Sequence, residues 1–159
     1  MSLPADRIKL ALIRHFLDQG QVCLTEFSLK SGRRADLIAL DRQDRITIIE
    51  VKSSAADFRA DKKWPDYTQW ADRFCFAVAE GFDLGLLPGP QEAGIYITDG
   101  FEAVLAQDPP TRQLAAARRR ALIGRLAKKA MGRESRQLLE AAGLPVTNLA
   151  EDDLASDGD

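Results

Sequence analysis

The spacing of apolar residues predicts that the chain begins with a helix followed by a small antiparallel sheet. Over residues 4–19, apolar side chains recur every three or four positions, which is the period of an amphipathic helix. Three runs of β-forming residues follow at 22–29, 35–40 and 46–51, and short polar segments separate them. These loops are so short that the pattern predicts two successive β-hairpins.

The middle of the chain predicts a helical region and three more strands. Ser54 and Asp57 have the spacing of a capping box, so a helical stretch should begin there, with a break at Pro65. Strand patterns then appear at residues 74–79, 94–98 and 102–106, and the last two flank the turn sequence Asp99-Gly100.

The C-terminal part predicts helices and then a disordered end. We expect a helix over residues 111–130 and a second, short helix that ends near Gly143. Residues 148–159 are polar and acidic, and we expect them to be disordered. The predicted organisation is one domain over residues 1–147 and an acidic tail.

Composition narrows the class of protein. The chain has 159 residues, of which 45% are hydrophobic, and its longest apolar runs are far shorter than the ~20 residues that span a membrane. The N-terminus has no signal-peptide pattern, so we expect a cytoplasmic protein without a membrane partner. Cys23 and Cys75 lack metal-ligand spacing, and His15 is the single histidine, which argues against zinc enzymes and triad hydrolases.

Charge is segregated along the chain. Residues 112–136 hold nine Lys and Arg against one acidic residue, whereas residues 137–159 hold six acidic residues and no basic one. Such a block is typical of a surface that binds a polyanion, with the acidic segment as an internal competitor. The alternative is an ordinary solvated helix face.

Ionic residues at the ends of apolar strands are the candidate chemistry. If the second hairpin turns about Gln43, then Asp36 lies opposite Glu50, and a three-residue loop at 30–32 places Glu26 opposite Asp36. Lys52 shares the face of Glu50, because strand side chains repeat with period two. The register therefore predicts three carboxylates in a row, with a lysine beside them.

Like charges placed opposite one another destabilise a sheet, so the row favours a bound cation. Carboxylates with water are the usual ligands of Mg²⁺, and a nearby lysine can act on water and on a phosphate. These residue types point to phosphodiester hydrolysis. A purely structural ion-pair network, in which Lys52 neutralises Glu50, is the alternative.

The order acid, hairpin, acid-x-Lys resembles the PD-(D/E)XK nuclease superfamily, with Asp36 followed after 14 residues by Glu50-Val51-Lys52. Ala35 stands where the superfamily's name has a proline. The chain also resembles the MmcB-like DNA repair family in the segments Gly32-Arg33-Arg34-Ala35-Asp36-Leu37, Glu50-Val51-Lys52-Ser53-Ser54, Asp57-Phe58-Arg59-Ala60-Asp61, Lys63-Trp64-Pro65-Asp66-Tyr67 and Ala117-Arg118-Arg119-Arg120-Ala121. The segment Lys63-Trp64-Pro65-Asp66-Tyr67 is the most distinctive of these.

The resemblance implies an α/β, three-layer restriction-endonuclease-like fold with a central mixed sheet, and an Mg²⁺- or Mn²⁺-dependent nuclease that acts on DNA in repair. It assigns Asp36, Glu50 and, directly or through water, Glu26 to the metal, and it assigns Lys52 to the water. A homodimer and other DNA repair proteins are compatible partners. A non-catalytic DNA-binding or scaffolding module on the same fold is the alternative function.

Phosphate contacts are expected from basic residues near the site and in the basic block. The first group is Arg33, Arg34, Lys62 and Lys63, and the second is Arg118, Arg119, Arg120, Lys128 and Lys129.

Overall fold

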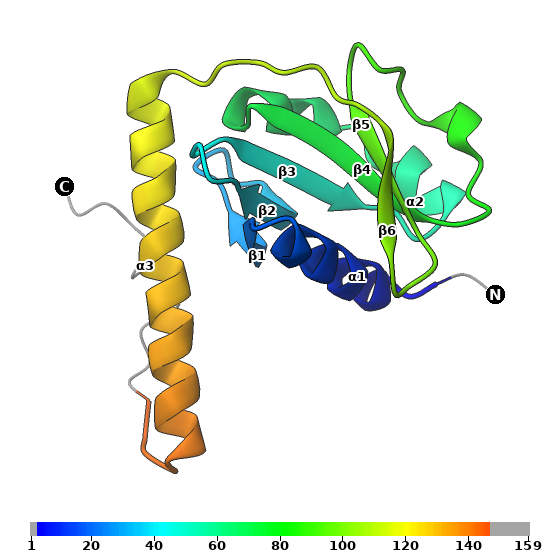
Figure 1. The fold of residues 1–159 in the computed structure, drawn as a ribbon. Coiled ribbons are helices and arrows are strands. Elements are labelled where there is room, and N and C mark those ends of the chain that lie inside the picture. The colour runs from blue at the N-terminus through cyan, green and yellow to red at the C-terminus, as the bar shows by residue number, and fades with distance from the viewer. Residues whose placement is uncertain (1–2, 147–159) are drawn as a thin grey trace. The chain divides into compact units, whose positions relative to one another are not determined.

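The computed structural model describes residues 3–146 and contains one six-stranded mixed sheet with flanking helices (Figure 1). The chain divides into two compact units, Met1–Leu114 and Ala115–Asp159. The elements of the first unit are α1 (Ala5–Asp18), β1 (Val22–Ser28), β2 (Arg34–Leu40), β3 (Ile46–Val51), α2 (Ala55–Ala60), the 3-10 helix η1 (Trp64–Trp70), β4 (Arg73–Ala79), the 3-10 helix η2 (Leu84–Leu86), β5 (Gly94–Thr98) and β6 (Ala103–Gln107). The second unit holds α3 (Ala116–Ala141).

Strand order in the sheet follows chain order, from β1 to β6. The pairs β1–β2, β2–β3 and β5–β6 are antiparallel, whereas β3–β4 and β4–β5 are parallel. A parallel pair requires a crossover connection, and α2 with η1 supplies it between β3 and β4. The predicted α/β class with a mixed sheet is confirmed.

The predicted hairpin register is confirmed on both sides of β2. Phe27 pairs with Ala35 in the first hairpin, and Leu37 pairs with Ile49 in the second. The first turn depends on Gly32, whose φ of 84° lies in the left-handed region that a three-residue hairpin loop requires.

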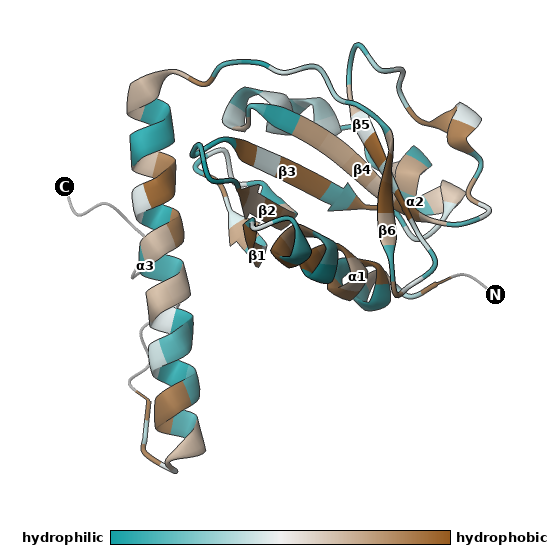
Figure 2. Ribbon diagram, in the orientation of Figure 1, coloured by the Kyte–Doolittle hydropathy of each residue, from teal (hydrophilic) through white to brown (hydrophobic). Residues whose placement is uncertain are grey.

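Both faces of the sheet are covered. On one face, Ile8, Leu12 and Phe16 of α1 form a core with Leu37, Ile49 and other side chains of the same strand face. On the other face, an aromatic cluster joins α2 and η1 to β4; its members are Phe58, Trp64, Tyr67, Phe74 and Phe76. Lying between these layers, β3 is buried throughout, and Figure 2 shows it hydrophobic over most of its length.

The helical region after β3 differs in detail from its prediction. Ser54 caps α2 as expected, since its hydroxyl accepts a hydrogen bond from the Asp57 amide at 3.1 Å. However, α2 ends at Ala60, before Pro65, and the chain resumes as the 3-10 helix η1. Proline in the first turn of η1 fits its fixed φ and missing amide donor.

The prediction of two C-terminal helices is wrong, because α3 is one helix of 26 residues. An internal glycine such as Gly132 costs a helix only about 1 kcal/mol, which does not interrupt it. The helix ends at Ala141, and the left-handed Gly143 follows its C-cap; the amides of Gly143 and Leu144 donate to the carbonyls of Glu140 and Leu139.

Two predictions concern residues beyond this part of the chain. The boundary after residue 147 and the disordered segment 148–159 lie outside the described residues. Within residues 3–146, no helix is long and apolar enough to cross a membrane.

Candidate active site

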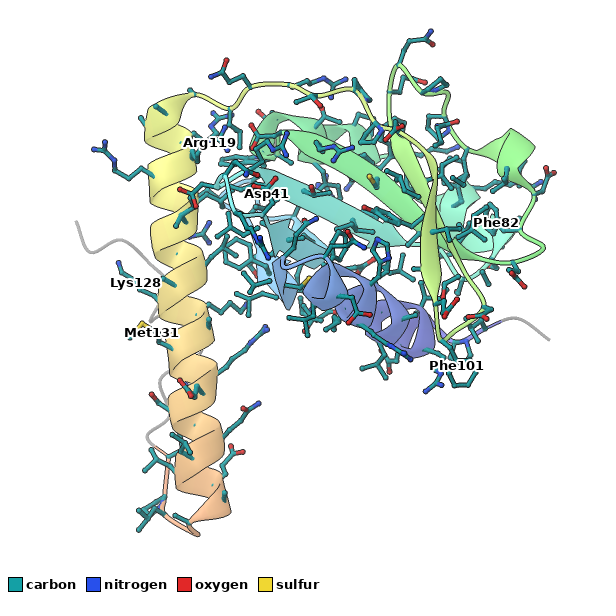
Figure 3. The ribbon with its side chains drawn as sticks, viewed as in Figure 1. Asp41, Phe82, Phe101, Arg119, Lys128 and Met131 are labelled. Atoms are coloured by element: carbon teal, nitrogen blue, oxygen red, sulfur yellow. The ribbon has the colours of Figure 1, made fainter. Side chains whose placement is uncertain are left out.

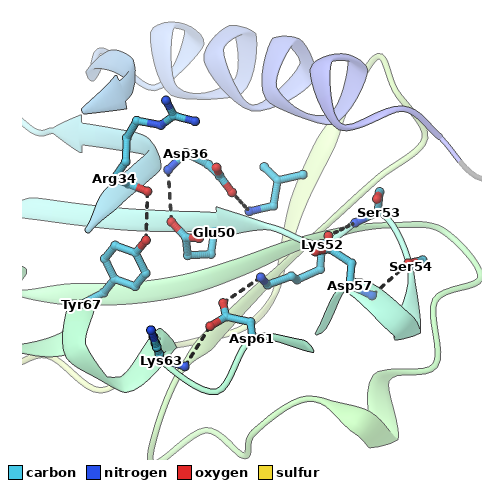
Figure 4. Close-up of polar contacts among 11 residues, drawn as sticks. Arg34, Asp36, Glu50, Lys52, Ser53, Ser54, Asp57, Asp61, Lys63 and Tyr67 are labelled. Atoms are coloured by element: carbon cyan, nitrogen blue, oxygen red, sulfur yellow. Dashed lines mark hydrogen bonds and ion pairs between the residues drawn. The ribbon is translucent and has the colours of Figure 1, made fainter. Parts of the chain in front are cut away.

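Two carboxylates meet where β2 and β3 separate, and each is bonded to the other strand. The Asp36 amide donates to Oε1 of Glu50 at 3.1 Å, and the Val51 amide donates to Oδ2 of Asp36 at 2.9 Å (Figure 4). Side-chain oxygens therefore take the place of backbone carbonyls as acceptors at this end of the hairpin. The predicted juxtaposition of Asp36 and Glu50 is present.

Burial and mutual repulsion make this pair hard to ionise together. Glu50 is only 5% exposed, and burial, followed by the charge of Asp36, raises its pKa to about 8. Burial also raises the pKa of Asp36, although the hydrogen bond from the Val51 amide opposes that shift. The site thus holds two acidic groups that a nearby positive charge would stabilise in their ionised form.

Lys52 lies on the same face as Glu50, directly after β3. Its amide donates to the carbonyl of Ala77, which continues the pairing with β4. Its ammonium, only 6% exposed, donates to Oδ2 of Asp61 at 2.7 Å. Despite the opposing effect of burial, this bond and that from the Lys63 amide hold the pKa of Asp61 below its usual value.

Asp61 is a site residue that the sequence interpretation missed. In the sequence, α2 separates Asp61 from its partner Lys52. The sequence signal for Asp61 was its place in the segment Asp57-Phe58-Arg59-Ala60-Asp61, which resembles the MmcB-like family.

Glu26 departs from the predicted row of three carboxylates. Its φ of 52° is a left-handed conformation that is rare for a non-glycine residue. Its Oε1 lies 2.8 Å from Nζ of Lys9 on α1, and its Oε2 lies 2.8 Å from Nε of Arg34. The prediction of a row of three carboxylates is therefore wrong, because the left-handed backbone at Glu26 brings its carboxylate to two cations. Its charge still contributes to the raised pKa of Asp36.

The segment between α2 and η1 contacts the start of β2. The hydroxyl of Tyr67 donates to the carbonyl of Arg34 at 2.9 Å, and Nε of Arg33 lies 3.3 Å from Oδ2 of Asp66. Burial, with the charges of Glu50 and Asp36 next in weight, raises the pKa of Tyr67. Tyr67 therefore stays neutral and serves as a hydrogen-bond donor beside the carboxylates.

Known proteins resemble this chain in sequence and in fold. The family model described as DNA repair protein MmcB-like matches residues 2–141. The chain belongs to the MmcB-like DNA repair protein family. A solved structure, the SPO1766 protein of unknown function from Silicibacter pomeroyi, is 36% identical to this MmcB-like chain, with a TM-score of 0.83; the match covers 92% of this chain and 98% of that one. No curated protein matches the MmcB-like chain described here.

The basic residues expected to contact phosphates fall into two groups in this MmcB-like protein. Near the carboxylates, Lys62 and Lys63 are exposed, while Arg33 and Arg34 form the ion pairs described above. On α3, the side chains of Arg118, Arg120 and Lys128 are exposed, Arg119 is half-buried and Lys129 is buried. Lys128 and Met131 project from the same side of α3 (Figure 3). The DNA contacts of both groups stay predictions.

Proposed function

We propose that this protein is a divalent-metal-dependent nuclease of the PD-(D/E)XK type that hydrolyses phosphodiester bonds in DNA during repair, on a restriction-endonuclease-like fold. The observation that carries the proposal is the pair of half-buried Asp36 and buried Glu50 at the open end of a hairpin, with Lys52 on the same face. Membership of a DNA repair family supports DNA as the substrate.

The carboxylate pair fits a metal such as Mg²⁺ or Mn²⁺. Mg²⁺ is usually held by one or two carboxylates, with water and substrate phosphates completing its shell. Asp36 and Glu50 would be the protein's ligands, because each carboxylate is bonded to the other's strand; among the described residues no group of three or more His, Cys, Asp or Glu could hold a metal. A bound cation would also relieve the repulsion that raises the pKa of Glu50.

Each residue of the site has a chemical role in such a hydrolysis. A divalent cation would supply Lewis-acid stabilisation of the phosphate and activate water. The ammonium of Lys52 would stabilise negative charge that develops on the phosphate and orient the attacking water. The aromatic cluster beneath Glu50, which includes its strand neighbour Phe76, keeps that side of the site dry and strengthens these interactions.

A non-catalytic DNA-binding module is the second candidate, and one observation favours it. Lys52 already has a carboxylate partner in Asp61, and Glu26 is held by two cations, as in a self-contained ion-pair network. A module of this kind would bind DNA but leave its phosphodiester bonds intact.

Cleavage assays on several DNA forms separate the two candidates. Single-stranded, duplex, flapped and branched DNA are incubated with the wild type in Mg²⁺ or Mn²⁺, with EDTA as the metal-free control. Asp36→Asn and Asp36→Ala should lose cleavage, whereas the matched control Glu92→Gln, at an exposed carboxylate, should retain it. DNA binding by the wild type without cleavage of any substrate would support the non-catalytic module.

A further inference from the structure

We propose that Asp61 is a positioning residue for Lys52, which it holds so that the Asp36–Glu50 pair stays available to a divalent cation. This inference rests on the proposed metal site and names the residue that tunes it. Among the described residues, the ion pair of Lys52 is with Asp61, and no ion pair within 4.0 Å joins its ammonium to Asp36 or Glu50.

The carboxylate of Asp61 is fixed at both oxygens. Asp61 caps the end of α2, where its amide donates to the carbonyl of Phe58 at 3.1 Å. Its Oδ1 accepts the Lys63 amide at 2.9 Å, and its Oδ2 accepts the ammonium of Lys52 at 2.7 Å (Figure 4). With the Asp61 side chain only 19% exposed, this is an anchored acceptor and not a mobile surface carboxylate.

Lys52 has other carboxylates within electrostatic reach. Its charge lowers the pKa of both Asp36 and Glu50, although burial outweighs that effect in each. If Asp61 were neutral, the charges of Asp36 and Glu50 would still attract the buried ammonium. Because a metal ion needs the same oxygens, a released Lys52 would compete with it.

Asp61 would thus act on metal binding through Lys52, and this coupling is measurable in a double-mutant cycle. Mn²⁺ binding is measured by calorimetry on the full chain for the wild type, Asp61→Asn, Lys52→Met and the double variant. Asp61→Asn should weaken Mn²⁺ binding about tenfold, since it frees a charged competitor. In the Lys52→Met background, the same change should alter binding by no more than about twofold, because only the through-space effect of one removed charge remains.

Two further variants complete the test. Asp57→Asn removes a carboxylate of α2 that accepts the Ser53 amide and is not the ion-pair partner of Lys52, so Mn²⁺ binding should be unchanged. Asp61→Glu keeps the charge and should bind Mn²⁺ within about threefold of the wild type; it also serves if Asp61→Asn does not fold.

The outcomes separate this inference from the proposed function. If the wild type binds Mn²⁺ and Asp61→Asn binds it equally well, or weakens binding by the same factor in both backgrounds, Asp61 does not act through Lys52. If the wild type does not bind Mn²⁺ at all, the metal site itself is absent and both proposals fail.

Discussion

Replacing Glu50 by glutamine should make the metal-free protein more stable at neutral and alkaline pH. Glutamine is close in shape to a protonated glutamic acid, and its side-chain oxygen can still accept the Asp36 amide that Oε1 of Glu50 accepts at 3.1 Å. The substitution therefore removes the titration of Glu50 while retaining its hydrogen bond. In the wild type, the pKa of Glu50 rises from 4.5 to about 8 on folding.

The sign follows from proton linkage. Between these two pKa values the folded state binds a proton that the unfolded state has released, so stability falls as pH rises. For a single group, the decrease between pH 5 and pH 8 is about 3 kcal/mol, and for a chain of this length that corresponds to roughly 6–12 °C in Tm. The lowered pKa values of Asp41 and Asp61 give stability that disappears only at more acidic pH, so they do not offset this trend.

Thermal unfolding in EDTA at constant ionic strength, followed from pH 5 to pH 8, measures the effect. The Tm of the wild type should fall across this range more steeply than that of Glu50→Gln, and Glu92→Gln should behave as the wild type. Adding Mg²⁺ or Mn²⁺ should raise the Tm of the wild type, most at alkaline pH, and leave that of Glu50→Gln unchanged. Parallel Tm curves for the wild type and Glu50→Gln would falsify the assignment of a proton to this carboxylate.

Three other predictions follow from the proposed function. Lys52→Ala should abolish DNA cleavage in a gel assay while Mn²⁺ binding is retained, because the lysine acts on water and phosphate; wild-type rates would remove it from the mechanism. Alanine at residues 118–120 should weaken binding to every DNA sequence, and the log-log salt slope should fall by about 0.7 to 0.9 for each phosphate that the variant no longer neutralises, whereas an unchanged slope would assign these arginines to interactions within the protein. Deleting the acidic residues after Asn148 should tighten DNA binding in a fluorescence titration if they compete for the basic block, and equal affinity would show that they do not.

The strand pairing could be predicted because the local signals agree. A three-residue hairpin loop such as residues 30–32 favours a turn that ends in a left-handed residue, and Gly32 supplies that residue. Once the turns are placed, pairing arithmetic puts Asp36 beside Glu50 without any knowledge of the rest of the fold. Lys52 follows from strand alternation alone. The positions of these three residues could be predicted from the sequence because they lie within or directly after two adjacent strands.

The contacts of Glu26 could not be predicted from the strand pairing. The pairing on both sides of Glu26 is the predicted one, but its own φ of 52° brings its carboxylate to Lys9 and Arg34. No property of a glutamate signals a left-handed backbone, and Lys9 comes from α1, whose placement on the sheet is a tertiary feature. Asp61 was missed for a related reason, because its contact with Lys52 depends on where α2 ends.

The charges of the assembled site fit the proposal that two carboxylates would hold a divalent cation. Asp36, Glu50 and Asp61 all lie within electrostatic reach of Lys52, and these four groups have a net charge of −2 when fully ionised. This excess equals in size the charge of one divalent cation. Glu26, whose side chain is 33% exposed, already has two cationic partners, Lys9 and Arg34. In the metal-free protein, the raised pKa of Glu50 keeps a proton on this carboxyl group, which reduces the negative charge of the site. Metal binding would release that proton.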